Sequence, residues 1–318
     1  MPTESPLIRP MFDGPVDLIG DVHGEIAALE QLLQRLGYDA DGRHDDGRRL
    51  VFIGDLVDRG PDTPAVLHRV KRMIDHGNAQ CIMGNHELNV LRMSRKDDNY
   101  WFHHEVKLDP AACAAQRLLP EQERGWVVDF LRSQPLALER DDLRVTHACW
   151  DDTAVDRLRT ATDALGVFKL SQRHICEQLD SDGIEDPIAR NLARQNKCPV
   201  KLFTSGREER AAQRFHAGGR ARGEARVPWW NDYSGQAFCV FGHYSRTKPE
   251  SQDGSGIPLF PGDPFTAVGH TMCIDFGVGG RAKQRLKGGI DPSLSLAALR
   301  WPEREVCLDD GRHASMQS

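Results

Sequence analysis

Five short apolar runs in this chain end in polar side chains, and this feature constrains the fold more than any other. The runs cover residues 16–20, 50–54, 79–84, 143–147 and 238–242. Each has the length of a buried strand, and the first two are followed by apolar residues at helical spacing. Open α/β sheets bind ligands in the loops beyond the ends of their strands. The pattern therefore predicts an α/β fold in which the functional groups gather where the strands end.

The two helical patterns are bounded by residues that start and stop helices. Residues 25–36 place their apolar side chains on one helical face, and Gly37 supplies a stop. In the second pattern Thr63 can act as a cap, Pro64 suits the first helical position, and Gly77 ends the helix. We expect two strand–loop–helix units whose loops carry the polar residues.

The domain organisation is predicted from where these polar residues stand. They are spread from Asp21 to His243, so parts of one site come from most of the chain and one catalytic domain is expected. The predicted segments are a single domain over 1–308, a helical insertion at about 95–135, a mobile Arg-rich loop at about 205–230, and a disordered tail over 309–318.

Composition excludes several classes of protein. Hydrophobic residues make up 39% of the chain and charged residues 28%, which suits a chain with a packed core. The formal charge of −6 argues against a stable nucleic-acid complex, although it is compatible with a nucleotide substrate. Eight cysteines without a CxxC pair are expected to be reduced and mostly buried. No leader pattern or long apolar run is present, so we expect a cytoplasmic protein that does not enter membranes. The oligomeric state stays open.

Six of the polar residues at the strand ends are of types that bind metal ions: Asp21, His23, Asp55, Asn85, His147 and His243. Hydrolysis of a phosphoester requires neutralised phosphate oxygens and a nucleophile that exists at neutral pH. Two metal ions about 3.5 to 4 Å apart supply both. Asp55 is the expected bridge between the ions, because a carboxylate has two oxygens and a negative charge. The mixed nitrogen and oxygen ligands favour Mn, Fe, Zn or related ions over Ca or Mg.

Each block alone is a weak signal, because short Asp-His or Asn-His sequences also occur in ordinary turns. Three such blocks at successive strand ends, in this order and followed by two strand-end histidines, favour a shared metal site.

The blocks resemble the signatures of the calcineurin-like metallophosphoesterases and, within them, of the phosphoprotein phosphatases. The matching residues are GDVHG at 20–24, GDLVDRG at 54–60 and GNHE at 84–87. The resemblance implies two mixed β-sheets packed as a sandwich and flanked by helices. It also implies two divalent ions, with Mn expected first and Fe, Zn, Co or Ni as the other candidates. One ion would be bound by Asp21, His23 and Asp55, and the other by Asp55, Asn85, His147 and His243.

The same resemblance assigns three catalytic roles. His86 would be the general acid toward the leaving oxygen, Asp58 would pair with His86 and favour its protonated form, and Arg59 would bind the phosphate. A protonated imidazole is a suitable acid near neutral pH. A guanidinium group can bind two phosphate oxygens at once.

The two halves of the chain suggest different substrates. Asp58 favours the serine/threonine phosphoprotein phosphatases, whereas the sequence after His243, with CIDFGVGG and LAALRW, resembles the bacterial symmetrical diadenosine tetraphosphatases. A second phosphate-binding arginine is not evident upstream of His243, so Arg246 and the arginines of residues 207–226 stay open as candidates.

We predict a serine/threonine-type phosphoprotein phosphatase. The alternative is a hydrolase of dinucleoside polyphosphates, so the partner is a phosphorylated protein or a nucleotide substrate. The remote alternative is a catalytically silent, metal-binding regulatory protein. It is disfavoured because Asp58, Arg59 and His86 are all present beside the six metal-binding residue types.

Overall fold

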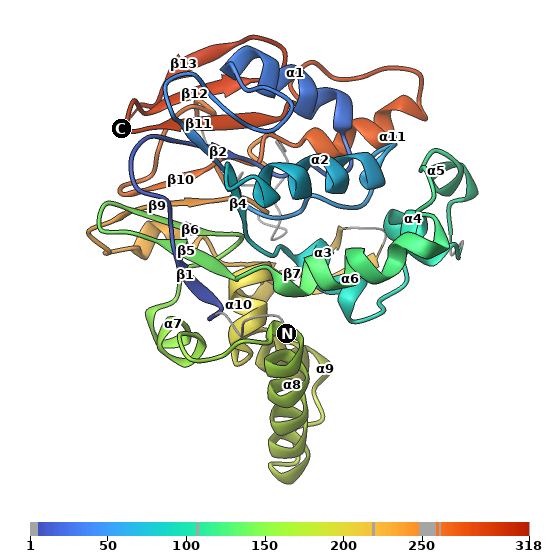
Figure 1. Ribbon diagram of the computed structural model, residues 1–318. Coiled ribbons are helices and arrows are strands. Elements are labelled where there is room, and N and C mark those ends of the chain that lie inside the picture. The colour runs from blue at the N-terminus through green and yellow to red at the C-terminus, as the bar shows by residue number, and fades with distance from the viewer. Residues whose placement is uncertain (1–5, 106–107, 218–219, 248–258, 261, 318) are drawn as a thin grey trace.

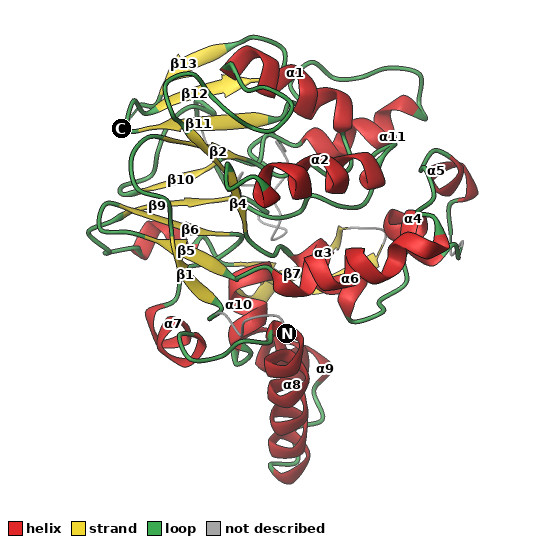
Figure 2. Ribbon diagram, viewed as in Figure 1, coloured by secondary structure: helices red, strands yellow, loops and turns green. Residues whose placement is uncertain are grey.

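The computed structural model describes residues 6–105, 108–217, 220–247, 259–260 and 262–317. Its main strands form two mixed β-sheets, and helices lie on the outer sides of the pair (Figures 1 and 2). This arrangement confirms the predicted α/β fold class.

The first sheet has the strand order β13-β12-β11-β2-β3-β4. Its strands are β2 (Val16–Ile19), β3 (Arg49–Phe52), β4 (Ala79–Cys81), β11 (Ala297–Trp301), β12 (Glu305–Leu308) and β13 (His313–Ser315). Strands β2, β3 and β4 are parallel neighbours, and β11, β12 and β13 add to them in antiparallel fashion. The carboxyl ends of β2, β3 and β4 therefore meet at one edge of the sheet.

The second sheet has the strand order β1-β5-β6-β9-β10. Its strands are β1 (Ile8–Pro10), β5 (Ala137–Glu139), β6 (Leu143–Thr146), β9 (Phe238–Phe241) and β10 (Thr271–Cys273). Strands β6, β9 and β10 run parallel to one another. His147 follows β6 directly and His243 lies two residues beyond β9, so these two histidines also stand at carboxyl ends of strands.

The packing of strands β2 and β3 between two apolar layers explains why their sequences are mostly apolar. Val16, Leu18 and Val51 face an inner apolar layer that they share with the second sheet. Ile19 and Phe52 point the other way, into the layer that holds the helices. Both faces of these strands are buried, so apolar residues predominate in their sequence.

Two helices follow the first two parallel strands, as predicted. Helix α1 (Ile26–Leu36) is followed by Gly37, which has a φ of 88°. This left-handed conformation is common at the C-terminus of a helix, and glycine adopts it readily. Helix α2 (Thr63–Asp75) differs in one detail. Its cap is Asp62, whose carboxylate accepts a hydrogen bond from Ala65 N at 2.9 Å, and Thr63 is already helical. An ionised oxygen at this position also interacts favourably with the helix dipole.

The remaining helices are distributed along the chain from residue 85 to residue 285. They are α3 (Asn85–Leu91), α4 (Tyr100–His103), α5 (Pro110–Ala114), α6 (Arg124–Ser133), α7 (Asp152–Leu158), α8 (Ala164–Ser181), α9 (Pro187–Asn196), α10 (Pro199–Ser205) and α11 (Arg281–Arg285), with 3₁₀ turns at Asp97–Asn99, Glu121–Glu123, Trp229–Asp232 and Val278–Gly280. Residues 95–135, predicted to be a helical insertion, contain α4, α5 and α6. Helices α8 and α9 project away from the sheets (Figure 1). Over the described ranges, no helix is long and apolar enough to cross a membrane.

Two segments differ from the prediction. Within residues 205–230, strands β7 (Glu208–Ala217) and β8 (Arg220–Arg226) form an antiparallel ribbon, so the Arg-rich segment is not a loop. The side chain of Asn196, at the end of α9, holds the start of β7 through two hydrogen bonds with the backbone of Glu208, at 2.6 and 3.0 Å.

The tail over 309–318 is likewise not disordered where the structure describes it. Strand β13 pairs with β12, and Ala314 stands opposite Val306. An edge strand is held by backbone hydrogen bonds, so polar side chains on its exposed faces do not prevent its formation.

Candidate metal centre

The loops at the strand ends have unusual backbone conformations. Five of the predicted site residues have a left-handed φ: His23 at 46°, Asp55 at 50°, Asp58 at 74°, Arg59 at 68° and His243 at 65°. Residues with a β-carbon rarely adopt this conformation, and it persists only where the surrounding structure enforces it. The strain is concentrated in the segments that carry the polar side chains.

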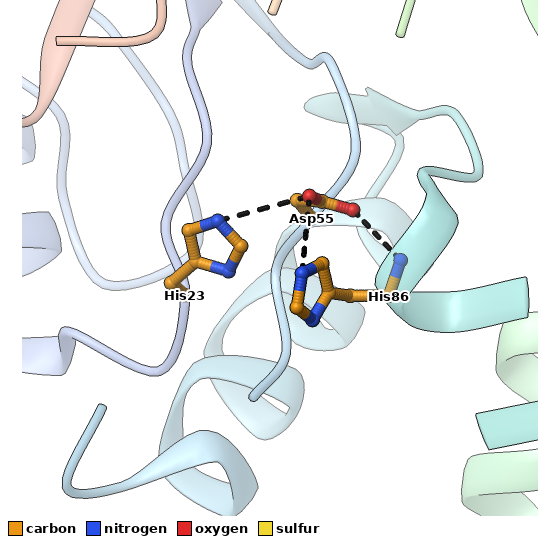
Figure 3. A group of neighbouring side chains, drawn as sticks. All are labelled: His23, Asp55 and His86. Atoms are coloured by element: carbon orange, nitrogen blue, oxygen red, sulfur yellow. Dashed lines mark hydrogen bonds and ion pairs between the residues drawn. The ribbon is translucent and has the colours of Figure 1, made fainter. Parts of the chain in front are cut away.

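Asp55 stands at the centre of the site. Its Oδ2 lies 3.3 Å from His147 Nε2, 3.7 Å from His23 Nε2 and 3.9 Å from His86 Nε2. Figure 3 shows the rings of His23 and His86 next to this carboxylate. Its other oxygen, Oδ1, accepts a hydrogen bond from His86 N at 2.9 Å. A β-carbon at Gly84 would come within 2.2 Å of Oδ1, so only glycine fits beside the carboxylate.

The imidazole rings are oriented by backbone carbonyls. His147 Nδ1 lies 2.8 Å from Ile53 O, and His23 Nδ1 lies 3.1 Å from Val57 O. A carbonyl can only accept, so each Nδ1 carries a hydrogen, and each Nε2 points toward Asp55. This is how proteins orient histidines that bind metals.

The other three candidate ligands complete the cluster. His243 N donates to Asp21 Oδ2 at 3.2 Å, and a β-carbon at Gly242 would come within 2.1 Å of Asp21 Oδ1. With its amide group turned so that both ends have hydrogen-bond partners, Asn85 donates through its nitrogen to His243 Nδ1 at 2.7 Å and to Thr204 O at 3.3 Å. All six residues predicted to bind metal are therefore brought together. Among the described residues, two groups have ligand atoms within 4.8 Å of one another: His23, Asp55 and His86, and Asp55, His147 and His243.

The pKa values of the two buried acids Asp21 and Asp55 are shifted in opposite directions. Burial, together with the nearby carboxyl groups of Asp275 and Asp55, holds the pKa of Asp21 well above its usual range. Burial alone would also raise the pKa of Asp55, but His147 and the other imidazoles hold it well below its usual value. Asp55 in turn overcomes the effect of burial on His147 and raises the pKa of that ring to about 10.

Burial lowers the pKa values of the two outer imidazoles and so favours their neutral forms. Burial lowers the pKa of His23 well below its usual value, and the charge of Arg59 adds to this effect. Burial has the same effect on the pKa of His243, to which Arg226 contributes. Buried carboxylates and neutral imidazoles that converge on one space are the donor set of a cation site, because buried charges need a partner. The residues therefore fit divalent metal ions.

A second chain of contacts joins His86 to the protein interior. His86 Nδ1 lies 2.7 Å from Asp58 Oδ2, and Trp101 Nε1 donates to Asp58 Oδ1 at 2.7 Å. Arg59 places Nη1 2.9 Å from His23 Nε2 and Nη2 2.9 Å from His86 Nε2. The structure thus brings the three predicted catalytic residues next to the candidate ligands. The contact of His86 with a carboxylate suits a general acid, and it also suits a metal ligand.

Three residues with a clear part in the site were not assigned a role from the sequence. Glu87 accepts hydrogen bonds from Gly84 N at 2.8 Å and Asp55 N at 2.9 Å, and so joins two of the loops. Trp101 holds Asp58, and the Asp98 carboxylate lies 3.6 Å from Arg59 Nε. Glu87 belongs to the GNHE block, so the motif could have indicated it. Trp101 and Asp98 carry no local signal.

The structure distinguishes between the candidates for a second phosphate-binding arginine. Arg226 Nη1 donates to His243 O at 3.3 Å and therefore lies beside the site. Arg246 stacks over Phe260, 4.7 Å from the ring centre, and donates to Thr266 O at 2.9 Å. Arg226 is the better placed of the two.

Comparisons with known proteins agree with this geometry. The family model described as calcineurin-like phosphoesterase matches residues 14–191. The chain is 33% identical over 144 residues to the asymmetrical bis(5'-nucleosyl)-tetraphosphatase of Halalkalibacterium halodurans. The aligned segment covers 42% of this chain and 56% of that protein. The chain is also 32% identical over 130 residues to the symmetrical bis(5'-nucleosyl)-tetraphosphatase of Janthinobacterium sp. (strain Marseille). This alignment covers 41% of the chain and 42% of that protein.

The chain thus spans about half the length of these curated relatives. Among solved structures, a cold-active protein-tyrosine phosphatase of a psychrophilic Shewanella aligns over 99% of this chain and 84% of its own, with a TM-score of 0.52 and 16% identity. This last likeness concerns the fold alone.

Proposed function

Because this chain belongs to the calcineurin-like phosphoesterase family and is therefore a hydrolase of phosphoesters, we propose that its substrates are dinucleoside polyphosphates. The observation that carries the choice of substrate is that the curated relatives are named bis(5'-nucleosyl)-tetraphosphatases. This choice replaces phosphoserine and phosphothreonine, which the sequence motifs favoured.

We further propose that the site holds two divalent ions, with Mn expected. Asp21, His23 and Asp55 would bind one, and Asp55 would share the other with Asn85, His147 and His243. This assignment is supported by the approach of His147 Nε2 and His23 Nε2 to Asp55 Oδ2, at 3.3 and 3.7 Å. When bound, such ions neutralise phosphate oxygens and acidify a water for attack.

The protein's own groups would then bind the phosphate and supply the proton. Arg59 places two guanidinium nitrogens toward the same space as His23 and His86, which suits it to bind two phosphate oxygens. Its contacts with the two rings would be exchanged for contacts with the substrate. His86 would donate a proton from Nε2 to the leaving oxygen, while Asp58 holds the ring through Nδ1.

The pairing of His86 with Asp58 favours a second candidate function. A general acid matters most when the leaving group is a poor one, such as the alkoxide of serine or threonine. A phosphate leaving group is stable as an anion and needs this help less. Hydrolysis of phosphoproteins is therefore retained as the second proposal.

One assay separates the two proposals. The purified protein in Mn would be given diadenosine tetraphosphate, a phosphoserine peptide and p-nitrophenyl phosphate in parallel, with a chelator-treated sample as the control. We expect kcat/KM for the tetraphosphate to exceed that for the peptide by at least 100-fold. A preference for the peptide would overturn the proposed substrate. Activity that survives complete chelation would overturn the proposed metal centre.

A further inference from the structure

The chain crosses from the second sheet to the first beside the metal centre. Between β10 and β11 lies the segment Val278–Arg285, here called the strap, which consists of a 3₁₀ turn and helix α11. Gly279 of the strap is buried, and a β-carbon built on it would lie 2.5 Å from His23 Cδ2 and 3.0 Å from Arg59 Nη1. The strap backbone therefore packs on the place where Arg59 meets His23.

The contact at Gly279 leaves no room for a side chain. The ring of His23 is fixed, because its Nδ1 donates to Val57 O at 3.1 Å and its Nε2 lies 2.9 Å from Arg59 Nη1. A β-carbon at Gly279 would displace Arg59, His23 or the strap itself. With glycine at this position, the strap backbone provides a surface against which the guanidinium group of Arg59 lies.

Two ion pairs fasten the strap to the protein. Arg281 donates to the two carboxylate oxygens of Asp309, from Nη1 at 2.6 Å and from Nη2 at 3.1 Å. Arg285 donates from Nη1 to Glu25 Oε1 at 2.6 Å, and its Nη2 contacts Oε2. Asp309 and Glu25 are both 1% exposed. A buried carboxylate needs a partner, and a bidentate pair with arginine has a fixed geometry, so both pairs restrain the strap.

The pair of Arg285 and Glu25 connects the strap to the loop that carries His23. Glu25 stands two residues after His23 in the sequence. The strap thus contacts this loop at two points, through Gly279 at the ring of His23 and through Arg285 at Glu25. Loop and strap form a closed ring of contacts, so a displacement of α11 changes where Gly279 lies relative to Arg59.

We propose that the strap positions Arg59 for phosphate binding, and that Arg285 and Glu25 are positioning residues that act through it. This inference rests on the proposed function in one respect, namely that Arg59 binds phosphate oxygens. The side chain of Arg59 is 35% exposed, and its ion pair with Asp98 is long, at 3.6 Å. A guanidinium group that is already oriented loses less conformational freedom when it binds its ligand. The packing of Gly279 supplies this orientation from a side that the substrate does not need.

The test measures the dissociation constant of orthophosphate by isothermal titration calorimetry, at a saturating concentration of Mn²⁺. In Arg285→Gln the constant should rise about fivefold, because the strap is released at one end. Glu25→Gln breaks the same pair from the other side and should have the same effect. The matched control is Lys287→Gln, which removes one positive charge from an exposed lysine two residues farther along the chain and should leave the constant unchanged. Metal analysis and circular dichroism show whether each variant keeps its Mn content and its fold.

A double-mutant cycle shows whether the strap acts through Arg59. In an Arg59→Ala background, Arg285→Gln should change the dissociation constant by less than about twofold, because the group that it positions is gone. Equal effects of Arg285→Gln in the two backgrounds would reveal a general structural role and overturn the proposal. Weaker binding in Arg59→Ala without any effect of Arg285→Gln would overturn the role of the strap alone. Unchanged binding in Arg59→Ala would count against the proposed phosphate contact itself, and the role of the strap would fall with it.

Discussion

The contact between Trp101 and Asp58 offers the sharpest test of how the site is held together. Trp101 is fully buried and its indole N–H donates to Asp58 Oδ1 at 2.7 Å, while the other oxygen of this buried carboxylate faces His86 Nδ1. Replacing Trp101 with phenylalanine keeps an aromatic ring and removes the donor. A hydrogen bond to a charged group contributes about 1.5–3 kcal/mol, so we expect the free energy of unfolding to fall by that amount. Loss of a partner that orients a catalytic side chain should also lower kcat about 10- to 100-fold.

The matched control for this variant is Trp229→Phe. Trp229 is also buried, but its Nε1 has no hydrogen-bond partner among the described residues. Both variants remove the same indole atoms, so the difference between them isolates the hydrogen bond to Asp58. Urea unfolding followed by circular dichroism, with Mn held constant, measures the first effect, and p-nitrophenyl phosphate turnover measures the second. If Trp101→Phe unfolds at the same midpoint as Trp229→Phe and keeps wild-type kcat, Trp101 does not support the site in this way.

Three further variants test separate parts of the site. His86→Asn should retain both metal ions while kcat falls by about 10² to 10⁴, as metal analysis and steady-state kinetics would show; loss of an ion would make His86 a ligand. Arg59→Ala should raise the inhibition constant of orthophosphate at least tenfold, and an unchanged constant would point to another cation. Gly84→Ala places a β-carbon 2.2 Å from Asp55 Oδ1, so it should lower the free energy of unfolding by about 1–3 kcal/mol and weaken metal binding. The control Gly125→Ala has open space around the added β-carbon and should cause neither effect.

Much of the site could be predicted from the sequence because its residues stand at recognisable strand ends. Asp21, Asp55 and Asn85 follow the apolar strands β2, β3 and β4, which are parallel neighbours, so their loops are bound to meet. His147 and His243 come from the other sheet. Their approach to Asp55 depends on how the two sheets pack, which only the family resemblance implied.

Residues that act through long-range contacts could not be found this way. Trp101 lies 43 positions from Asp58 in a stretch without a helical or strand period, so no local pattern reveals their hydrogen bond. The ribbon of β7 and β8 was missed for a related reason. Its sequence is charged and lacks apolar alternation, and its strands are held by pairing of the backbone and by Asn196. Strand β13 is likewise formed by backbone pairing with β12 rather than by a buried face of its own.

The most direct test is the position of Mn in crystals soaked with that ion and measured by anomalous scattering. Two peaks about 3.5 to 4 Å apart are expected, one on each side of the Asp55 carboxylate. Crystals of Asp55→Asn should show one peak or none, and that variant should be inactive. A single peak in the wild-type protein, no peak at all, or two peaks that persist in an active Asp55→Asn protein would contradict a pair of ions joined by this residue.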